Sequence, residues 1–245
     1  MPTGSPTRFP TATPTGTPPV TIPDGFDNVT TPIFPTDPPD CPCRDPLIAL
    51  RGGHCLRIKN ANFFGTLGYF TRATDGVGIL SNFHVTLAPP NSLTSALGFR
   101  VFPNDFVATV SRVAFNKFVD ASHSPLCRRP PPPFMLVDGT VIPGIQGARC
   151  FDNVRFCGCN SGCTGIGIIH STNWCGFVRY SFGIFRFCNQ ILFRPVPRPG
   201  DSGSLLINAD TSRATGLVFA RIGTVYGLAN PIRTVLASLG VSLAT

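Results

Sequence analysis

The stretch Pro199-Gly200-Asp201-Ser202-Gly203-Ser204 has the composition of a tight, glycine-supported turn around an exposed serine. A serine that attacks a carbonyl group needs such a turn, because its hydroxyl must be accessible and backbone N–H groups must point at the oxyanion that forms. We therefore expect Ser202 to be a nucleophile, the N–H groups of Gly200 and Ser202 to be the oxyanion donors, and Asp201 to hold the loop by pairing internally. An ordinary Gly-Asp-Ser-Gly turn is the alternative.

A histidine has to activate this serine, because serine alone is a poor nucleophile at neutral pH. Of the four histidines, His84 follows the apolar run Val77–Ser81, at a strand end where a side chain can face a cleft. The other histidines adjoin a glycine, lie in a turn or follow an acid: His54, His170 and His123. We predict that His84 is the base, with a structural or surface histidine as the alternative.

The carboxylate that orients the imidazole is predicted to be Asp120. The run Phe118-Val119-Asp120-Ala121 places this side chain inside an apolar segment, where a buried charge needs a hydrogen-bonding partner. The competing aspartates lie in sequences typical of turns or polar loops: Asp105, Asp138 and Asp152.

The composition predicts an all-β fold. All 12 acidic residues are aspartate, which excludes catalysis through a glutamate pair or a glutamate-containing metalloprotease helix. With 25 Gly, 26 Pro, 21 Phe and two Lys, the chain lacks the residues that long helices need. No run of 18 apolar residues is present, so we expect no membrane span.

Short apolar runs separated by turn residues begin near Asp45 and predict two β units. The segment 128–134 predicts a linker between them, because its four successive prolines lack the N–H donors that a sheet interior requires. A helix is predicted on the second unit, with Asn230 as its cap, Pro231 at its first position and an apolar stripe that ends at Leu239. The predicted strands cover 55–59, 66–72, 77–81, 106–115, 118–121, 135–142, 154–157, 165–170, 177–182, 187–193, 204–208, 215–220 and 224–228.

Residues 1–44 predict a disordered arm, because residues 1–40 hold 11 Pro and 10 Thr and bury too little apolar surface to fold. The first residues do not have the apolar core of a signal peptide. The arm and the ten cysteines nevertheless favour an extracellular location. Disulfides are the preferred state of the cysteines, with a zinc site at Cys157, Cys159 and Cys163 or free thiols as alternatives.

The net charge is uneven along the chain. Residues 1–45 hold two Arg and five Asp, whereas the remainder carries an excess of positive charge that brings the total to +8. We do not expect nucleic-acid binding, because no Lys/Arg-rich block with interleaved aromatic residues accompanies the charge.

Several motifs in one order resemble the chymotrypsin-like (trypsin-fold) serine proteases, and most closely a bacterial and plant branch of them. They are Gly65-Thr66-Leu67-Gly68, Leu80-Ser81-Asn82-Phe83-His84-Val85, Val119-Asp120-Ala121, Ser161-Gly162-Cys163-Thr164-Gly165, Gly200 to Ser204, and Asn230-Pro231-Ile232. The resemblance runs from about Gly52 to Leu239 and leaves the N-terminal arm outside it.

The resemblance implies two six-stranded antiparallel β-barrels with the site between them. The first barrel would cover about 45–127 and the second, with its helix, about 135–245. It implies a serine endopeptidase that acts on polypeptides through His84, Asp120 and Ser202 and that requires no metal or cofactor. Val196, Gly216 and Val218 would lie at the substrate-binding pocket. The oligomeric state is not predicted.

The sequence departs from the motifs of this family at some positions. Phe83 replaces the second asparagine of the usual motif, and His123 lies close enough to Asp120 to compete for its carboxylate. A catalytically silent binding protein on the same fold is the alternative, because a fold does not guarantee activity.

Overall fold

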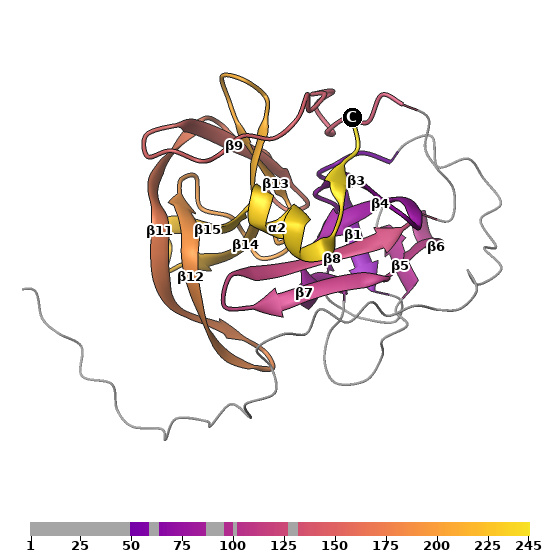
Figure 1. Cartoon of the computed structure of the whole chain (residues 1–245), viewed down its shortest axis with the longest axis horizontal. Helices are drawn as coiled ribbons and strands as arrows, with labels where there is room; N and C mark the ends of the chain where they lie inside the picture. The colour runs from indigo at the N-terminus through magenta and orange to yellow at the C-terminus, as the bar shows by residue number, and fades with distance from the viewer. Residues whose placement is uncertain (1–49, 59–63, 87–95, 100–101, 127–131) are drawn as a thin grey trace, which may run out of the picture.

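The computed structural model describes residues 50–58, 64–86, 96–99, 102–126 and 132–245. The short alternating runs form antiparallel strands, which confirms the predicted all-β class. The strands form two barrels side by side, and helix α2 (Ile232–Leu239) lies where they meet (Figure 1). None of the described helices is long and apolar enough to cross a membrane.

The first barrel is built from two sheets. One has the strand order β2-β1-β5-β6, and the other has the order β16-β3-β4-β8-β7, in which the C-terminal β16 joins as an edge strand. A bridge between Ala108 and Leu126 connects the two sheets. The strands are β1 (Cys55–Ile58), β2 (Phe64–Thr66), β3 (Tyr69–Ala73), β4 (Gly76–Ser81), β5 (Ala96–Phe99), β6 (Phe102–Thr109), β7 (Arg112–Asn116), β8 (Val119–Pro125) and β16 (Ser242–Leu243).

The second barrel is one sheet with the order β10-β9-β11-β12-β15-β14-β13, closed by pairing of β9 with β13. Its longest strands, β11 and β12, form a hairpin that projects well beyond the barrel (Figure 1). The strands are β9 (Asn153–Gly158), β10 (Gly162–Cys163), β11 (Gly167–Tyr180), β12 (Gly183–Phe193), β13 (Leu205–Asn208), β14 (Ala214–Ile222) and β15 (Tyr226–Pro231).

Some strand predictions were wrong in their boundaries. The two strands expected over 165–170 and 177–182 are the single strand β11, whose register shifts between Ile169 and Gly176 break the alternating pattern. The strand expected over 106–115 is divided between β6 and β7. The segment 135–142 forms only the isolated bridge between Met135 and Val141.

The C-terminal helix is confirmed, but its predicted cap was wrong. Pro231 occupies the N-cap position, and no side chain caps the helix. Asn230 instead accepts a hydrogen bond from the backbone N–H of Asp120, so its side chain turns away from the helix. The prediction that the helix packs on the second unit was also incomplete. Its buried side chains share one core cluster with first-barrel residues such as Leu80 and Ala121.

Disulfides join six of the cysteines. Cys55–Cys159 links the two barrels, Cys157–Cys163 links β9 to β10, and Cys175–Cys188 crosses the β11–β12 hairpin. Exposed Cys150 has no disulfide partner among the described residues. The N-terminal arm, three cysteines and the start of the proline linker lie outside the described residues: 1–44, Cys41, Cys43, Cys127 and 128–131.

Candidate active site

His84 lies on the single helical turn α1 (Phe83–Thr86), which follows β4 directly. The turn forms because the N–H groups of Val85 and Thr86 both donate to the carbonyl of Asn82. The imidazole is mostly covered, with 18% of the side chain exposed. Most of the ring is therefore covered by the protein, and a small part remains accessible to solvent.

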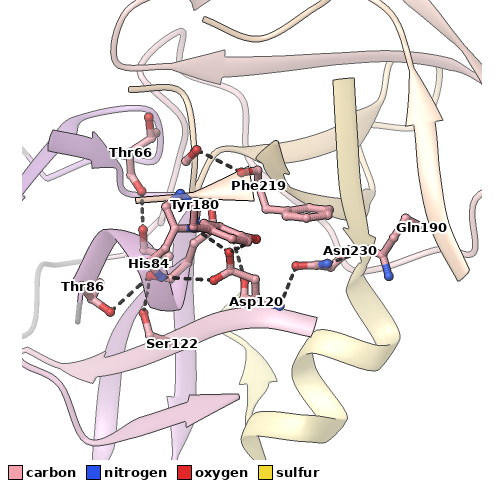
Figure 2. A network of polar contacts seen from close by, with 12 residues as sticks. Thr66, His84, Thr86, Asp120, Ser122, Tyr180, Gln190, Phe219 and Asn230 are labelled. Carbon is pink, nitrogen blue, oxygen red and sulfur yellow. Dashed lines mark hydrogen bonds and ion pairs between the residues drawn. The ribbon is translucent and has the colours of Figure 1, made fainter. Parts of the chain in front are cut away.

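Asp120 lies on β8 and is fully buried, as the apolar run around it predicts. Its Oδ2 is 2.5 Å from His84 Nδ1, and its Oδ1 accepts the His84 backbone N–H at 3.2 Å (Figure 2). Both carboxylate oxygens thus contact the same residue. This geometry fixes the ring orientation and favours the tautomer with a proton on Nδ1, which leaves Nε2 free to accept one.

A second layer of polar groups holds the backbone of Asp120 in place. Asn82 Nδ2 donates to the Asp120 carbonyl at 2.6 Å, and the Asp120 N–H donates to Asn230 Oδ1 at 3.1 Å. Asn230 Nδ2 in turn donates to Gln190 Oε1 at 2.6 Å (Figure 2). These buried amides hold the backbone of β8 at Asp120 in a fixed position against the second barrel. Sequence analysis assigned no role in the site to Asn230 or Gln190.

The turn around Ser202 is held by the buried carboxylate of Asp201, but most of its partners lie in the 160–161 loop and not, as predicted, within the turn itself. Asp201 Oδ1 accepts the N–H groups of Asn160 and Ser161 at 3.0 and 2.9 Å, and Oδ2 accepts the Ser161 hydroxyl at 2.5 Å and the Arg198 N–H at 2.7 Å. Gly200 has a φ of +96°, a conformation that side chains with a Cβ rarely adopt. In the described part of the chain, the N–H groups of Gly200 and Ser202 donate to no acceptor.

Thr66 attaches this turn to the first barrel. The Thr66 N–H donates to the Ser202 carbonyl at 2.8 Å, and the Thr66 hydroxyl donates to the Gly200 carbonyl at 2.8 Å. A Cβ at Gly203 would lie 2.2 Å from the Thr66 carbonyl oxygen, so only glycine allows the approach. The Gly65–Gly68 motif of the first barrel therefore positions the serine of the second.

His84 and Ser202 line the same pocket, which has a volume of about 510 Å³. Ser202 Oγ donates to the Phe219 carbonyl at 3.2 Å, so its hydroxyl hydrogen points toward this carbonyl in the structure. The pocket lies between the end of the β11–β12 hairpin and the end of β14. Its other lining residues are Phe177, Val178, Arg179, Tyr180, Ser181, Phe182, Phe219, Ala220, Arg221 and Ile222.

None of the three predicted substrate-binding residues lines this pocket. Val218 is fully buried in the second-barrel core, and Gly216 packs against Ala229 and Ile191. The residues of β14 that do line the pocket begin one position further along, at Phe219. Val196 is partly buried in the segment between β12 and the Ser202 turn.

Tyr180 is a site residue that sequence analysis missed. Its hydroxyl donates to Asp120 Oδ2 at 2.8 Å, and its ring centroid is 5.1 Å from that of His84. Burial, followed by the charge of Asp120, raises the pKa of Tyr180 well above its ordinary value. The hydroxyl therefore stays protonated and acts as a donor. No local motif marks this tyrosine in the sequence.

His123 does not compete for the Asp120 carboxylate. It lies three residues along the same strand, so its side chain points to the opposite face of β8. Its Nδ1 is 2.8 Å from Thr71 Oγ1, and its Nε2 is 3.6 Å from Asp75 Oδ1. Burial lowers the pKa of His123 to about 4 despite the nearby Asp75 carboxylate. It is a neutral core histidine.

The other described histidines and candidate aspartates do not line the pocket. His54 accepts the Arg51 N–H, and the exposed His170 packs against the Tyr226 ring. Asp138 pairs with Arg155 at 2.6 Å, and Asp152 accepts the Arg149 N–H. The Asp105 side chain lies outside the described residues.

One group of potential metal ligands lies close together in the described chain: Asp138, Cys157 and Cys163. The two cysteines are joined to each other by a disulfide, which removes both thiolates that a zinc ion would bind. The cysteine cluster is therefore a disulfide-linked loop in this structure.

The comparison with solved structures identifies the fold. No protein-family model matches the sequence, and neither does any curated protein. Among solved structures, Thermobifida fusca Protease A aligns with a TM-score of 0.62 at 20% identity over 80% of this chain and 98% of its own. A glutamic acid-specific serine protease aligns with a TM-score of 0.64 at 17% identity over 80% and 100%. Nocardiopsis Protease aligns with a TM-score of 0.61 at 19% identity over 80% and 98%.

These neighbours define the class of the fold. The chain has the two-barrel fold of the trypsin-like serine proteases. The described residues of this chain place a histidine–carboxylate pair from the first barrel and a serine turn from the second barrel at one pocket.

Proposed function

We propose that the protein is a serine endopeptidase whose catalytic residues are His84, Asp120 and Ser202. The observation that carries the proposal is the 2.5 Å contact between His84 Nδ1 and buried Asp120, on a ring that shares a pocket with Ser202. Such a pair supplies a base whose second ring nitrogen would accept a proton from a serine in the same pocket. The same two-barrel fold occurs in solved serine proteases, which supports this chemistry.

The reaction would proceed by acyl transfer. Ser202 Oγ attacks the scissile carbonyl carbon while its proton moves to His84 Nε2, and Asp120 stabilises the imidazolium that results. The N–H groups of Gly200 and Ser202, which have no acceptor among the described residues, would donate to the oxyanion. The imidazolium returns the proton to the leaving amine as the C–N bond breaks. Water then hydrolyses the acyl ester by the same steps in reverse order.

A fluorescent fluorophosphonate tests the nucleophile, because it reacts covalently with activated serines. Purified protein should be labelled at Ser202, and Ser202→Ala should abolish both labelling and hydrolysis of labelled casein. Ser181→Ala is the matched control, because Ser181 is an exposed serine that lines the same pocket. It should be labelled like the parent protein.

The two possible outcomes separate the enzyme from the silent binding protein. Absence of labelling in a folded parent protein would favour the binding protein and overturn the proposal. Labelling that persists in Ser202→Ala would show that another residue is the nucleophile. Melting temperatures of all three proteins establish that the variants are folded.

A further inference from the structure

We propose that Tyr180 is a positioning residue of the catalytic site, which holds the Asp120 carboxylate from the second barrel. This inference rests on the proposed function, because it assigns Asp120 to the orientation of His84. Asp120 Oδ2 accepts two hydrogen bonds, from His84 Nδ1 at 2.5 Å and from the Tyr180 hydroxyl at 2.8 Å. Figure 2 shows Tyr180 and His84 converging on this carboxylate.

The Tyr180 hydroxyl has no substitute in this part of the molecule. Within the described residues, the donors to the Asp120 carboxylate are the ring and backbone N–H of His84 and the hydroxyl of Tyr180. Asp120 is fully buried, so water cannot replace a lost donor without a rearrangement. Without Tyr180, both contacts would come from the residue that the carboxylate is meant to orient.

The placement of Tyr180 depends on the projecting β11–β12 hairpin. Tyr180 pairs with Gly183 at the end of this hairpin, so its position is set by the last rung of the ladder. The disulfide Cys175–Cys188 crosses the hairpin, and the Cys188 N–H donates to the carbonyl of Lys117 in the β7–β8 turn. The hairpin is thereby attached to the strand that carries Asp120.

Aromatic side chains attach the end of the hairpin to the first barrel. The Phe115 ring lies 5.7 Å from both the Tyr180 and Phe182 rings and 4.9 Å from the Phe83 ring. Phe115 pairs with Asp120 across β7 and β8, and Phe83 precedes His84 in the chain. The cluster therefore packs the hairpin against the immediate neighbours of both His84 and Asp120. This contact gives a structural reason for phenylalanine at position 83.

The hydroxyl of Tyr180 should affect catalysis in a way that packing alone cannot. Its hydrogen bond draws part of the carboxylate charge away from His84. When the hydroxyl is absent, the full charge acts on the imidazolium and stabilises it more strongly. The carboxylate also loses a constraint on its orientation, which slows the attack by Ser202. Tyr180→Phe removes the hydroxyl and keeps the ring in the aromatic cluster.

The test measures fluorophosphonate labelling of the full chain from pH 5 to pH 9. Tyr180→Phe should lower the labelling rate at saturation about ten- to a hundredfold, the loss expected for a hydrogen bond to a buried charge. The half-saturating probe concentration should change little, because the ring still lines the pocket. The acid limb of the pH profile should move to higher pH. Tyr226→Phe is the matched control and should leave all three quantities unchanged, because Tyr226 lies outside the pocket.

Proton NMR of the His84 ring tests the same coupling without any turnover. Among the described residues, the ionisable groups that face or share the pocket with His84 are Asp120, Tyr180, Arg179 and Arg221, and the variant alters only one of them. The resonance of the His84 Nδ1–H proton should move in Tyr180→Phe and not in Tyr226→Phe. An unchanged Nδ1–H resonance in folded Tyr180→Phe would overturn the proposal, even if the labelling rate fell.

This design keeps two failures apart. If neither the parent protein nor its variants react with the probe, the proposed function fails, but the NMR measurement of the His84 Nδ1–H proton still decides whether Tyr180 acts on the His84–Asp120 pair. If the parent protein reacts and the variant matches it in rate and pH profile, the role of Tyr180 is refuted while the nucleophile stands.

Discussion

Replacement of Asp120 by asparagine removes one negative charge and replaces one carboxylate oxygen with an NH2 group, which carries two donors, at almost constant volume. The outcome depends on where the new amide nitrogen goes. At the Oδ1 position it would face the His84 backbone N–H, which lies 3.2 Å away, and two donors would oppose each other. At the Oδ2 position it would face His84 Nδ1 and the Tyr180 hydroxyl, and both of these can accept a hydrogen bond.

The amide nitrogen should therefore occupy the Oδ2 position. It would then donate to His84 Nδ1, which forces the ring proton onto Nε2. In the proposed mechanism, Nε2 is the nitrogen that accepts the proton of Ser202. In the serine protease template, the same change costs about 10⁴-fold in turnover. This factor corresponds to about 5 kcal/mol of transition-state stabilisation. We expect a loss of that size for Asp120→Asn.

The assay is hydrolysis of labelled casein together with the fluorophosphonate labelling rate, for Asp120→Asn and for the control Asp152→Asn. Asp152 is partly exposed and contacts the Arg149 N–H, so its variant should retain at least half of the parent rate. A loss of less than tenfold in folded Asp120→Asn would refute the orienting role of this carboxylate. A large loss in Asp152→Asn would show that the acid has been misassigned.

Two further predictions concern specificity and acid stability. A fluorogenic peptide library should show no preference for cleavage after Arg or Lys. Arg179 and Arg221 line the pocket, and among the described residues no lining side chain carries a carboxylate that could pair with a desolvated cation. A preference for basic residues would refute the pocket assignment and leave the proposed triad untouched. Buried His123 has a pKa of about 4, below the unfolded value of about 6.5, so the unfolded chain takes up this proton first as the pH falls. Because of this proton uptake, the free energy of unfolding should decrease by about 3 kcal/mol between pH 6.5 and pH 4. Urea titrations at the two pH values should show a smaller decrease for His123→Gln than for the control His170→Gln.

Local sequence was sufficient for features that depend on neighbours in the chain. The glycines around Ser202 predict a tight turn, because the positive φ at Gly200 and the hydrogen bonds that join Asp201 to Arg198 and Ser204 all lie within a few residues. The apolar run around Asp120 predicts its burial for a similar reason, since strand alternation and hydrophobicity are local properties. His84 follows a strand whose end is also visible in the pattern.

Strand boundaries and the helix cap were harder to predict because they depend on pairing partners. The register shifts in β11 are imposed by its ladder with β12, so one long strand appeared in the sequence as two short ones. Asn230 has the local signature of a helix cap, but its side-chain oxygen accepts the backbone N–H of Asp120 instead. Tertiary hydrogen bonding prevailed over the local preference.

The sequence by itself predicted the all-β class that the structure confirms, and it predicted the tight turn around Ser202 and the candidates His84 and Asp120. Only the tertiary structure decided that Tyr180 reaches Asp120, that Asn230 and Gln190 support the strand behind it, and that the pocket begins at Phe219 rather than at Val218. The physical reason is distance along the chain. Tyr180 lies 60 residues from Asp120, and Asn230 lies 110 residues from it. No local periodicity or turn chemistry specifies contacts over such separations, which arise when the two barrels pack against each other.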